Sequence, residues 1–387
     1  MVTHKQSLED TALSRRIFHA ITSHPERSIS FADYMEICLY DPEAGYYAHP
    51  TGRPIGREGD FFTSVSVGAT YGYLLSLALL ERWRDDLGRP DRLVVVEQGA
   101  HDGRLAGDIL AGLAERRAAG VPGPGQVRYL VHEPDPGRRQ SLENASRQWS
   151  HPYPGDFVLE VVGDGPAQPF ESGVYLCNEL LDAFPVHRIR WQSARWVECR
   201  VGLVGDGVLG WIESAIAAES DLAEAVAVIP TDRLPDGYTT ELCLGYEPWV
   251  AQVVRWFRRG LWWIVDYGFE AADFYDPART EGTLRGYRDH RRTDDPFEAP
   301  GETDLTTDVD FTRLDRAACR HRLRRRQFTD QHHFLIAAAA PWLLEIESGG
   351  AEKLAAERQR LRQFQTLTHP GLMGRAFKIA EYDRPAD

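Results

Sequence analysis

The sequence predicts an α/β fold that combines a doubly wound parallel sheet, an N-terminal helical segment and an antiparallel β insertion. The sheet is predicted by a strand, a glycine turn and a helix that follow one another within residues 92–116. Leu93–Val96 is an unbroken apolar run with three valines, which is typical of a strand buried on both faces of a parallel sheet. Apolar residues at helical spacing follow over 105–116. These pieces form half of a nucleotide-type βαβ unit.

The turn after this strand carries an acid and two glycines. Glu97 stands where the strand should end, and Gly99 and Gly103 follow it. An acid in that place can accept hydrogen bonds from a ribose or an amino group. A phosphate-binding loop would need a Lys-Ser/Thr pair, and a dinucleotide loop would have the spacing G-x-G-x-x-G; neither is present here. A turn that only lets the helix pack on the sheet is the alternative without a ligand.

Helices and a long loop are predicted before this unit. An opening helix covers 7–24, and a second helix begins at Ser30 and stops before Pro42, because proline disfavours the helical conformation in the residue before it. Residues 41–68 are rich in glycine and proline and predict a long ordered loop, a feature that is usually functional in compact domains. Helical spacing returns over 71–84.

Polar side chains follow two further predicted strands. The strand over 127–133 ends at Glu133, which is placed like the acid that holds ribose hydroxyls in doubly wound folds; an exposed strand-end carboxylate is the alternative. The strand over 174–178 ends in a polar group of Asn178, Glu179 and Asp182. Open α/β sheets bind ligands at this carboxyl edge.

The second half of the chain returns to the same pattern after an insertion. Short alternating segments over 187–230 predict β-hairpins. The elements expected after them are a helix at 247–259, a strand at 261–266, a second long loop at 270–310, a helix at 311–322, a strand at 324–328, a helical tail and an edge strand at 376–382. We divide the chain into an N-terminal helical segment with an active-site loop (1–70), the first part of the sheet domain (71–186), an inserted antiparallel lobe (187–246) and the remainder of the sheet domain (247–387).

Composition excludes several classes of protein. A net charge of −14 argues against nucleic-acid binding over the whole surface. No apolar run approaches the ~20 residues that span a bilayer, and the polar first residues favour a cytoplasmic location. The five cysteines form no C-x-x-C pair, so neither a zinc site nor a disulfide framework is predicted. His332 and His333 would point to opposite faces of a strand, which is unsuited to one metal ion.

Several segments together resemble the MidA-like S-adenosylmethionine (SAM)-dependent methyltransferases, in the right order from about residue 30 to 382. The segments are 59–64 (GDFFTS), 97–103 (E-x-G-x-x-x-G), 178–186 (NELLDAFPV), 265–268 (VDYG), and 282–290 continuing to 308–311. The resemblance implies a Rossmann-like SAM methyltransferase fold with SAM as cofactor. It also implies a protein substrate, because the mitochondrial members symmetrically dimethylate an arginine of a respiratory complex I subunit. A homodimer is a further expectation.

The resemblance also assigns candidate cofactor-binding residues, which are Gly59, Thr63, Glu97, Gly99, Ala100, His101, Gly103, Glu133 and Asn178. This chain departs from the family pattern at His101, where the family commonly has a glycine. It also lacks the proline and glutamate that usually follow the segment at 59–64. The second departure bears more on the identity of the substrate than on SAM binding.

Arginine methylation would need acids beside the acceptor. The guanidinium pKa exceeds ~12, so carboxylates must orient the group and localise electron density on the reacting nitrogen. Asp60, Glu179 and Asp182 are the candidate catalytic residues, and the alternative is that Asp60 and Asp182 only cap loops and helices. The long loops at 56–66 and 282–311 are expected to converge over the site, with Arg285 on its rim. Methylation of another protein or a small molecule, and a SAM-binding assembly factor without turnover, remain open; a nicotinamide dehydrogenase is disfavoured.

Overall fold

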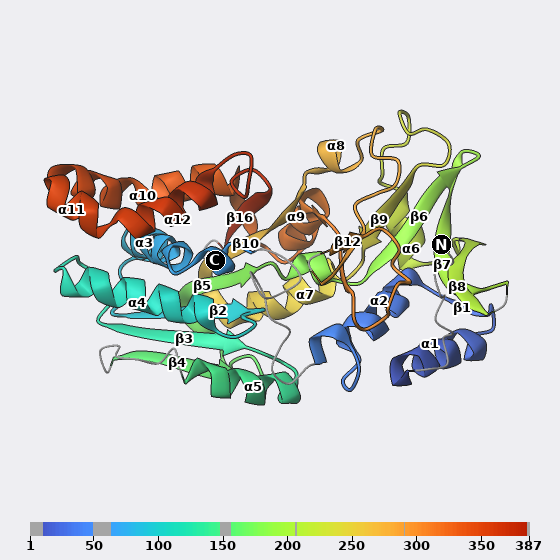
Figure 1. Cartoon of the computed structure of the whole chain (residues 1–387), viewed down its shortest axis with the longest axis horizontal. Coiled ribbons are helices and arrows are strands. Elements are labelled where there is room, and N and C mark those ends of the chain that lie inside the picture. The colour runs from blue at the N-terminus through green and yellow to red at the C-terminus, as the bar shows by residue number, and fades with distance from the viewer. Residues whose placement is uncertain (1–10, 49–62, 148–155, 206, 290, 385–387) are drawn as a thin grey trace.

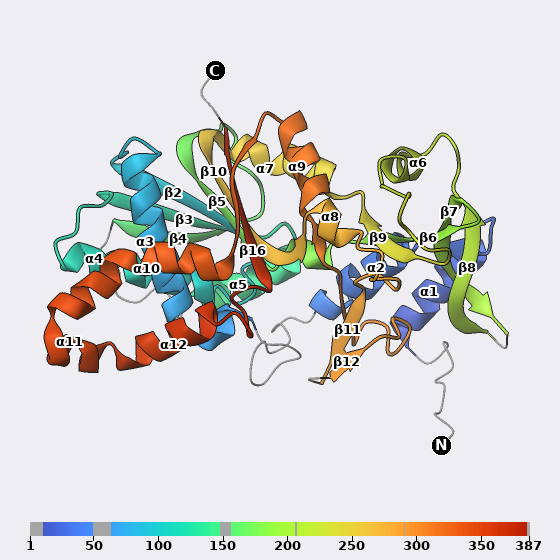
Figure 2. The same ribbon diagram turned by 90° about the horizontal axis from the view of Figure 1, so that it is seen from above.

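Two sheets at opposite ends of an elongated molecule organise the chain (Figures 1 and 2). The computed structural model describes residues 11–48, 63–147, 156–205, 207–289 and 291–384. The larger sheet has eight strands and is mainly parallel, and the five-stranded second sheet is antiparallel. The predicted α/β fold with an antiparallel insertion is therefore confirmed.

The large sheet reverses its strand order at its centre. From one edge to the other it runs β15 (Arg324–Asp330), β16 (Phe377–Arg384), β10 (Phe257–Phe269), β5 (Phe170–Asn178), β2 (Arg92–Gln98), β3 (Gln126–His132) and β4 (Phe157–Val162), with β14 (Val309–Asp310) beside β10. The chain builds outward from β2 toward β4 and then returns to lay β5 on the other side of β2. Such a reversal opens a crevice at the carboxyl ends of the two central strands, where doubly wound folds bind ligands.

Helices cover both faces of this sheet. Side chains alternate along β2, so that Val95 packs with one layer of helices and Val94 and Val96 pack with the other. The first layer consists of α3 (Thr70–Asp85), α4 (Arg104–Ala118), α10 (Gln331–Ser348) and α12 (Arg358–Thr368). The second includes α7 (Tyr246–Val253) and α9 (Phe311–Arg320). The helices α5 (Pro136–Ser146) and α11 (Gly350–Ala356) complete the domain.

The insertion after β5 forms the antiparallel sheet. It holds β6 (Val186–Gln192), β7 (Arg195–Val204), β8 (Val208–Ala215) and β9 (Thr239–Cys243), and α6 (Asp221–Val226) packs against it. Val186 at the start of β6 pairs with Cys243 at the end of β9, so the insertion enters and leaves at one point.

The N-terminal segment lies against this second sheet, as Figure 2 shows. It contains α1 (Ala12–Ser23), β1 (Ser28–Ile29), which pairs with β7, and α2 (Phe31–Tyr40). The predicted start of α2 is correct, because Ser30 and Asp33 form a reciprocal capping box there. The helix ends before Asp41-Pro42, as expected.

Several expectations for the second half of the chain are wrong. The helix predicted over 247–259 ends at Val253, and β10 already begins at Phe257. Arg258 and Arg259, which were assigned to the helix, are exposed residues of this strand. The segment at 270–310 is a folded region with α8 (Ala271–Phe274), β11 (Arg285–Arg288), β12 (Arg291–Thr293) and β13 (Asp304–Thr306). The last three make a small sheet that the sequence did not reveal.

The edge of the large sheet also differs from the expectation. β16 was predicted at the edge, but it lies between β10 and β15, and the arginine-rich β15 is the edge strand. His332 and His333 belong to the first turn of α10 instead of a strand. Within the described ranges, no helix is both long and apolar enough to cross a membrane.

Candidate active site

The glycine turn after β2 has a left-handed backbone at three positions. The φ angles are 81° at Gly99, 50° at His101 and 78° at Gly103, which directly precedes α4. Glycine adopts this conformation freely, whereas a residue with a Cβ pays roughly 1 kcal/mol. The left-handed turn therefore explains why glycine suits position 101, and His101 holds the turn under strain.

Glu97 lies beneath this turn and is almost fully buried, with 2% of its surface exposed. The Tyr129 hydroxyl donates a hydrogen bond of 2.7 Å to its Oε2 atom. Burial raises the pKa of the Glu97 carboxyl to about 7, although the hydrogen bond from Tyr129 opposes the shift. Glu97 thus sits at the end of β2 as predicted, in an environment that disfavours its charge.

Glu133 lies at the neighbouring strand end. Its Oε1 atom accepts hydrogen bonds from the Asp135 backbone N–H (2.9 Å) and from Arg138 (3.2 Å). Its own N–H donates to the Val162 carbonyl at the end of β4, so the ends of β3 and β4 lie side by side. Gly163 and Asp164 follow β4 at this edge, and the sequence reasoning missed them because it did not identify β4.

The polar group after β5 forms one connected network. Tyr71 donates to Asn178 Oδ1 (2.7 Å), and Asn178 Nδ2 donates to Glu179 Oε1 (2.9 Å). The Tyr267 hydroxyl donates to Glu179 Oε2 (3.0 Å). Burial and the charge of Asp182 raise the pKa of Glu179 to about 8, against the opposing hydrogen bonds. Glu179 also has a left-handed φ of 53°, a strain that is common at functional sites.

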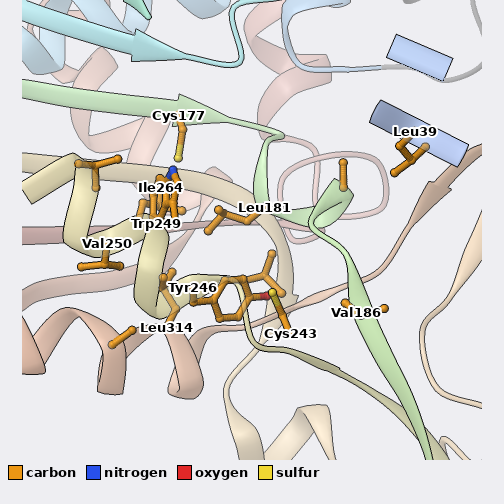
Figure 3. Packing of buried hydrophobic residues seen from close by; sticks show 14 of the residues in the cluster. Leu39, Cys177, Leu181, Val186, Cys243, Tyr246, Trp249, Val250, Ile264 and Leu314 are labelled. Atoms are coloured by element: carbon orange, nitrogen blue, oxygen red, sulfur yellow. The ribbon is translucent and has the colours of Figure 1, made fainter. Parts of the chain in front are cut away.

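Asp266 holds the backbone of this turn, and it lies three residues before the end of β10, which continues past the predicted end at 266 to Phe269. Its Oδ2 accepts a hydrogen bond of 2.8 Å from the Leu181 N–H, with longer bonds from Leu180 and Asp182, and its Oδ1 accepts the Tyr267 N–H at 2.9 Å. Leu181 in turn belongs to the same buried cluster as Trp249 and Ile264 (Figure 3). The turn that carries Glu179 and Asp182 is therefore fixed from both sides. Sequence reasoning did not give Asp266 this role.

Asp182 faces the segment after β13 and the start of β11. It is buried, and burial raises the pKa of its carboxyl to about 6, against the positive charge of Arg285. Arg285 forms an ion pair of 2.7 Å with Asp308. The Thr307 N–H donates to the Asp182 carbonyl (2.9 Å), so the 282–311 segment reaches the turn after β5.

Part of the other predicted loop lies outside the described residues, including Gly59 and Asp60. Its described end begins at Thr63, which is buried with 4% of its surface exposed. Thr63 forms a local turn with Ser66. The backbone of Ser64 hydrogen-bonds to Glu179, so this end of the loop does approach the acids.

The strand ends fit a nucleoside-type cofactor. At Gly99 a Cβ atom would lie 3.1 Å from the Leu180 side chain, so the glycine turn packs closely against the side chain of Leu180, which follows β5. The left-handed turn, Glu97 and Glu133 lie at the carboxyl ends of adjacent strands, next to the point where the strand order reverses between β2 and β5. SAM is a cofactor of this type. Ala100, also in the turn, is buried.

Comparisons with known proteins agree with this arrangement. Residues 74–329 match the family described as "Putative S-adenosyl-L-methionine-dependent methyltransferase". A Drosophila melanogaster relative, named protein arginine methyltransferase NDUFAF7 homolog, mitochondrial, is 28% identical and covers 89% of this chain and 82% of its own. The Homo sapiens protein arginine methyltransferase NDUFAF7, mitochondrial, is 26% identical over 95% of this chain and 82% of its own.

A solved structure shows the same overall fold. A Burkholderia thailandensis protein described as a "likely methyl transferase", bound to S-adenosyl-homocysteine, aligns with a TM-score of 0.81 and 26% identity. The alignment covers 97% of this chain and 92% of that chain.

The comparisons also correct one expectation. The relatives from Drosophila melanogaster, Homo sapiens and Mus musculus are all named as mitochondrial proteins, which contradicts the cytoplasmic location expected from the sequence. Because the family match extends over more than half of the sequence and the strand ends fit the cofactor, the chain belongs to the S-adenosyl-L-methionine-dependent methyltransferase family.

Proposed function

We propose that the protein transfers a methyl group from SAM to an arginine side chain of a protein substrate. The observation that carries the proposal is the placement of Glu179 and Asp182 on one rigid turn beside the glycine turn. Two carboxyl groups at this place suit a guanidinium acceptor, which carries a fork of N–H donors. The names of the relatives, protein arginine methyltransferases, support the same acceptor.

The site residues have separate roles in this proposal. Glu179 and Asp182 orient the guanidinium group, and Asp60, which lies outside the described residues, is proposed as a third acid in the same role. When it is bound, SAM supplies an electrophilic methyl group. Glu179 would accept the proton that the methylated nitrogen must lose, because the positive charge of a bound guanidinium favours the ionised form of this carboxyl.

The cofactor-binding roles are also proposed. The backbone of the turn containing Gly99, Ala100, His101 and Gly103 would approach the cofactor, while Glu97 and Glu133 would face its amino-acid and ribose ends. Asn178, Thr63 and Gly59 would complete the pocket.

The test is methylation of a defined protein acceptor. The purified enzyme is incubated with methyl-labelled SAM and proteins from a strain that lacks this gene, and the labelled acceptor is hydrolysed to separate methylated arginines from other methylated residues. We expect label in dimethylarginine and its loss with Asp60→Ala or Glu179→Gln. Label in another residue would redirect the proposal to another acceptor. SAM binding without any labelled acceptor would favour an assembly factor without turnover.

The identity of the acceptor and the oligomeric state of the protein are also part of the proposal. A subunit of respiratory complex I is the proposed acceptor, and a homodimer is the proposed form in solution. Light scattering coupled to gel filtration measures the second directly. We also retain the four-part domain division as a proposal.

A further inference from the structure

One arginine of the chain, Arg285, lies beside the proposed catalytic acids and pairs with Asp308. The Arg285 side chain is 16% exposed and that of Asp308, its ion-pair partner, is 11% exposed. The guanidinium carbon of Arg285 lies 5.6 Å from the centre of the Tyr267 ring. A planar guanidinium between a carboxylate and an aromatic face is the arrangement in which arginine binds better than lysine.

The same groups connect Arg285 to the proposed catalytic acids. The ring that Arg285 covers belongs to Tyr267, whose hydroxyl donates to Glu179. Arg285 also acts electrostatically on Asp182, because its positive charge favours the ionised form of that carboxyl. An acceptor arginine at Glu179 and Asp182 would therefore meet the positive charge of Arg285.

The backbone around Arg285 is held firmly. The Thr283 N–H donates to Glu241 (2.7 Å), and the Thr283 hydroxyl accepts the Asp308 N–H (3.0 Å). Arg285 itself pairs with Thr306 in the register of β11 and β13. The backbone is thus fixed, and only the side chain is free to leave the site by rotation.

We propose that Asp182, Asp308 and the Tyr267 ring form a guanidinium-binding site, and that Arg285 occupies it in the substrate-free protein as an internal competitor of the acceptor arginine. This inference rests on the proposed function, because it assigns a regulatory element to the same site. It defines the substrate as a guanidinium side chain that must displace Arg285 to reach the acids.

The experiment uses Arg285→Ala and methylguanidinium chloride as the probe. The variant lacks the internal guanidinium, so methylguanidinium should raise its melting temperature in a saturable manner, with affinity at least about tenfold higher than for the wild type. Combining Arg285→Ala with Asp182→Asn or Asp308→Asn should remove this gain in methylguanidinium affinity. Methylammonium chloride at equal ionic strength should give no gain, because it lacks the planar fork.

Arg360 provides a matched control. Its guanidinium carbon lies 3.9 Å from the centre of the Tyr73 ring, and it pairs with Glu115, away from the acids after β5. Arg360→Ala should gain no methylguanidinium affinity. An equal gain in that variant, or no saturable gain in Arg285→Ala, would overturn the proposal. Arg285→Gln, which removes the positive charge but keeps much of the length of the side chain, serves as the second variant where the alanine variant is unfolded.

This test is independent of methyl transfer. It requires neither SAM nor a protein acceptor, so failure to bind methylguanidinium contradicts the role of Arg285 and leaves arginine methylation to be judged by the labelling experiment. Conversely, saturable methylguanidinium binding by Arg285→Ala would establish the binding site itself, whereas label in a residue other than arginine would contradict the role of Arg285 as a competitor of the acceptor.

Discussion

The Tyr267 hydroxyl donates a 3.0 Å hydrogen bond to Glu179 Oε2, across the turn after β5. The two residues come from neighbouring parallel strands, since Tyr267 follows Asp266 in β10 and Glu179 directly follows β5. The bond stabilises the ionised form of Glu179, which burial and Asp182 disfavour. Tyr267 is therefore placed to set the pH at which Glu179 can accept a proton.

Tyr267→Phe should shift the pH dependence of methyl transfer. Loss of the hydroxyl donor raises the pKa of Glu179 further, so the acidic limb of the kcat/KM profile should move upward by up to about one pH unit. Tyr71→Phe is the control, because that hydroxyl donates to Asn178 instead of Glu179. Equal shifts in both variants would remove Tyr267 from this role.

Glu179→Gln should separate chemistry from cofactor binding. We expect methyl transfer to fall by roughly 100-fold or more, which is the scale for an oriented electrostatic contact, while SAM affinity changes only a few-fold. Glu133→Gln should show the reverse pattern, with weaker SAM binding measured by calorimetry. A Glu179→Gln enzyme of normal activity would rule out the proposed role of this acid.

The same Glu179→Gln variant should change how stability depends on pH. Since the folded-state pKa of Glu179 is raised to about 8 from 4.5, the folded protein holds a proton that the unfolded chain has lost, and wild-type stability falls as pH rises through this window. The stability of the glutamine variant does not fall in this way, because glutamine has no proton to lose in this pH range. Relative to wild type it should gain up to about 4 kcal/mol between pH 5 and pH 9, taking about 1.4 kcal/mol per pKa unit from pH 5 up to the raised pKa of about 8. Denaturant unfolding at both pH values measures the difference, and a constant difference would contradict the prediction.

His101→Gly should relieve the strained glycine turn. Replacing a residue with a φ of 50° by glycine should stabilise the protein by about 0.5–1 kcal/mol, with SAM affinity kept or increased. Arg89→Gly is a matched control, because Arg89 has a φ of 56° and lies after α3, away from the glycine turn. It should give a similar gain in stability without a change in SAM affinity. His101→Ala, which keeps the Cβ, should give no gain.

The sequence was informative where local pattern determines structure. The apolar run at 93–96 and the following glycines were enough to locate β2 and its turn, because a buried parallel strand needs such a run and a left-handed backbone favours glycine. The strand-end rule likewise placed Asn178, Glu179 and Asp182 at one edge of the sheet.

Contacts between distant residues were beyond this reasoning. Asp266 acts through backbone N–H groups more than 80 residues before it, and the pair of Arg285 and Asp308 depends on a small sheet that no periodic pattern revealed. β4 carries a strand-like apolar sequence, FVLEVV, which the sequence analysis did not assign to a strand. The start of β10 was missed because two exposed arginines precede its apolar run.

The pairing of Val186 with Cys243 has a consequence for how this architecture can diversify. Because the insertion begins and ends at two paired residues, it can be lengthened, shortened or exchanged without moving a strand of the large sheet. The insertion can therefore change while the acids after β5 and the glycine turn after β2 keep their places. A chimaera that exchanges 187–242 for the corresponding segment of a relative would measure what this insertion contributes to acceptor choice.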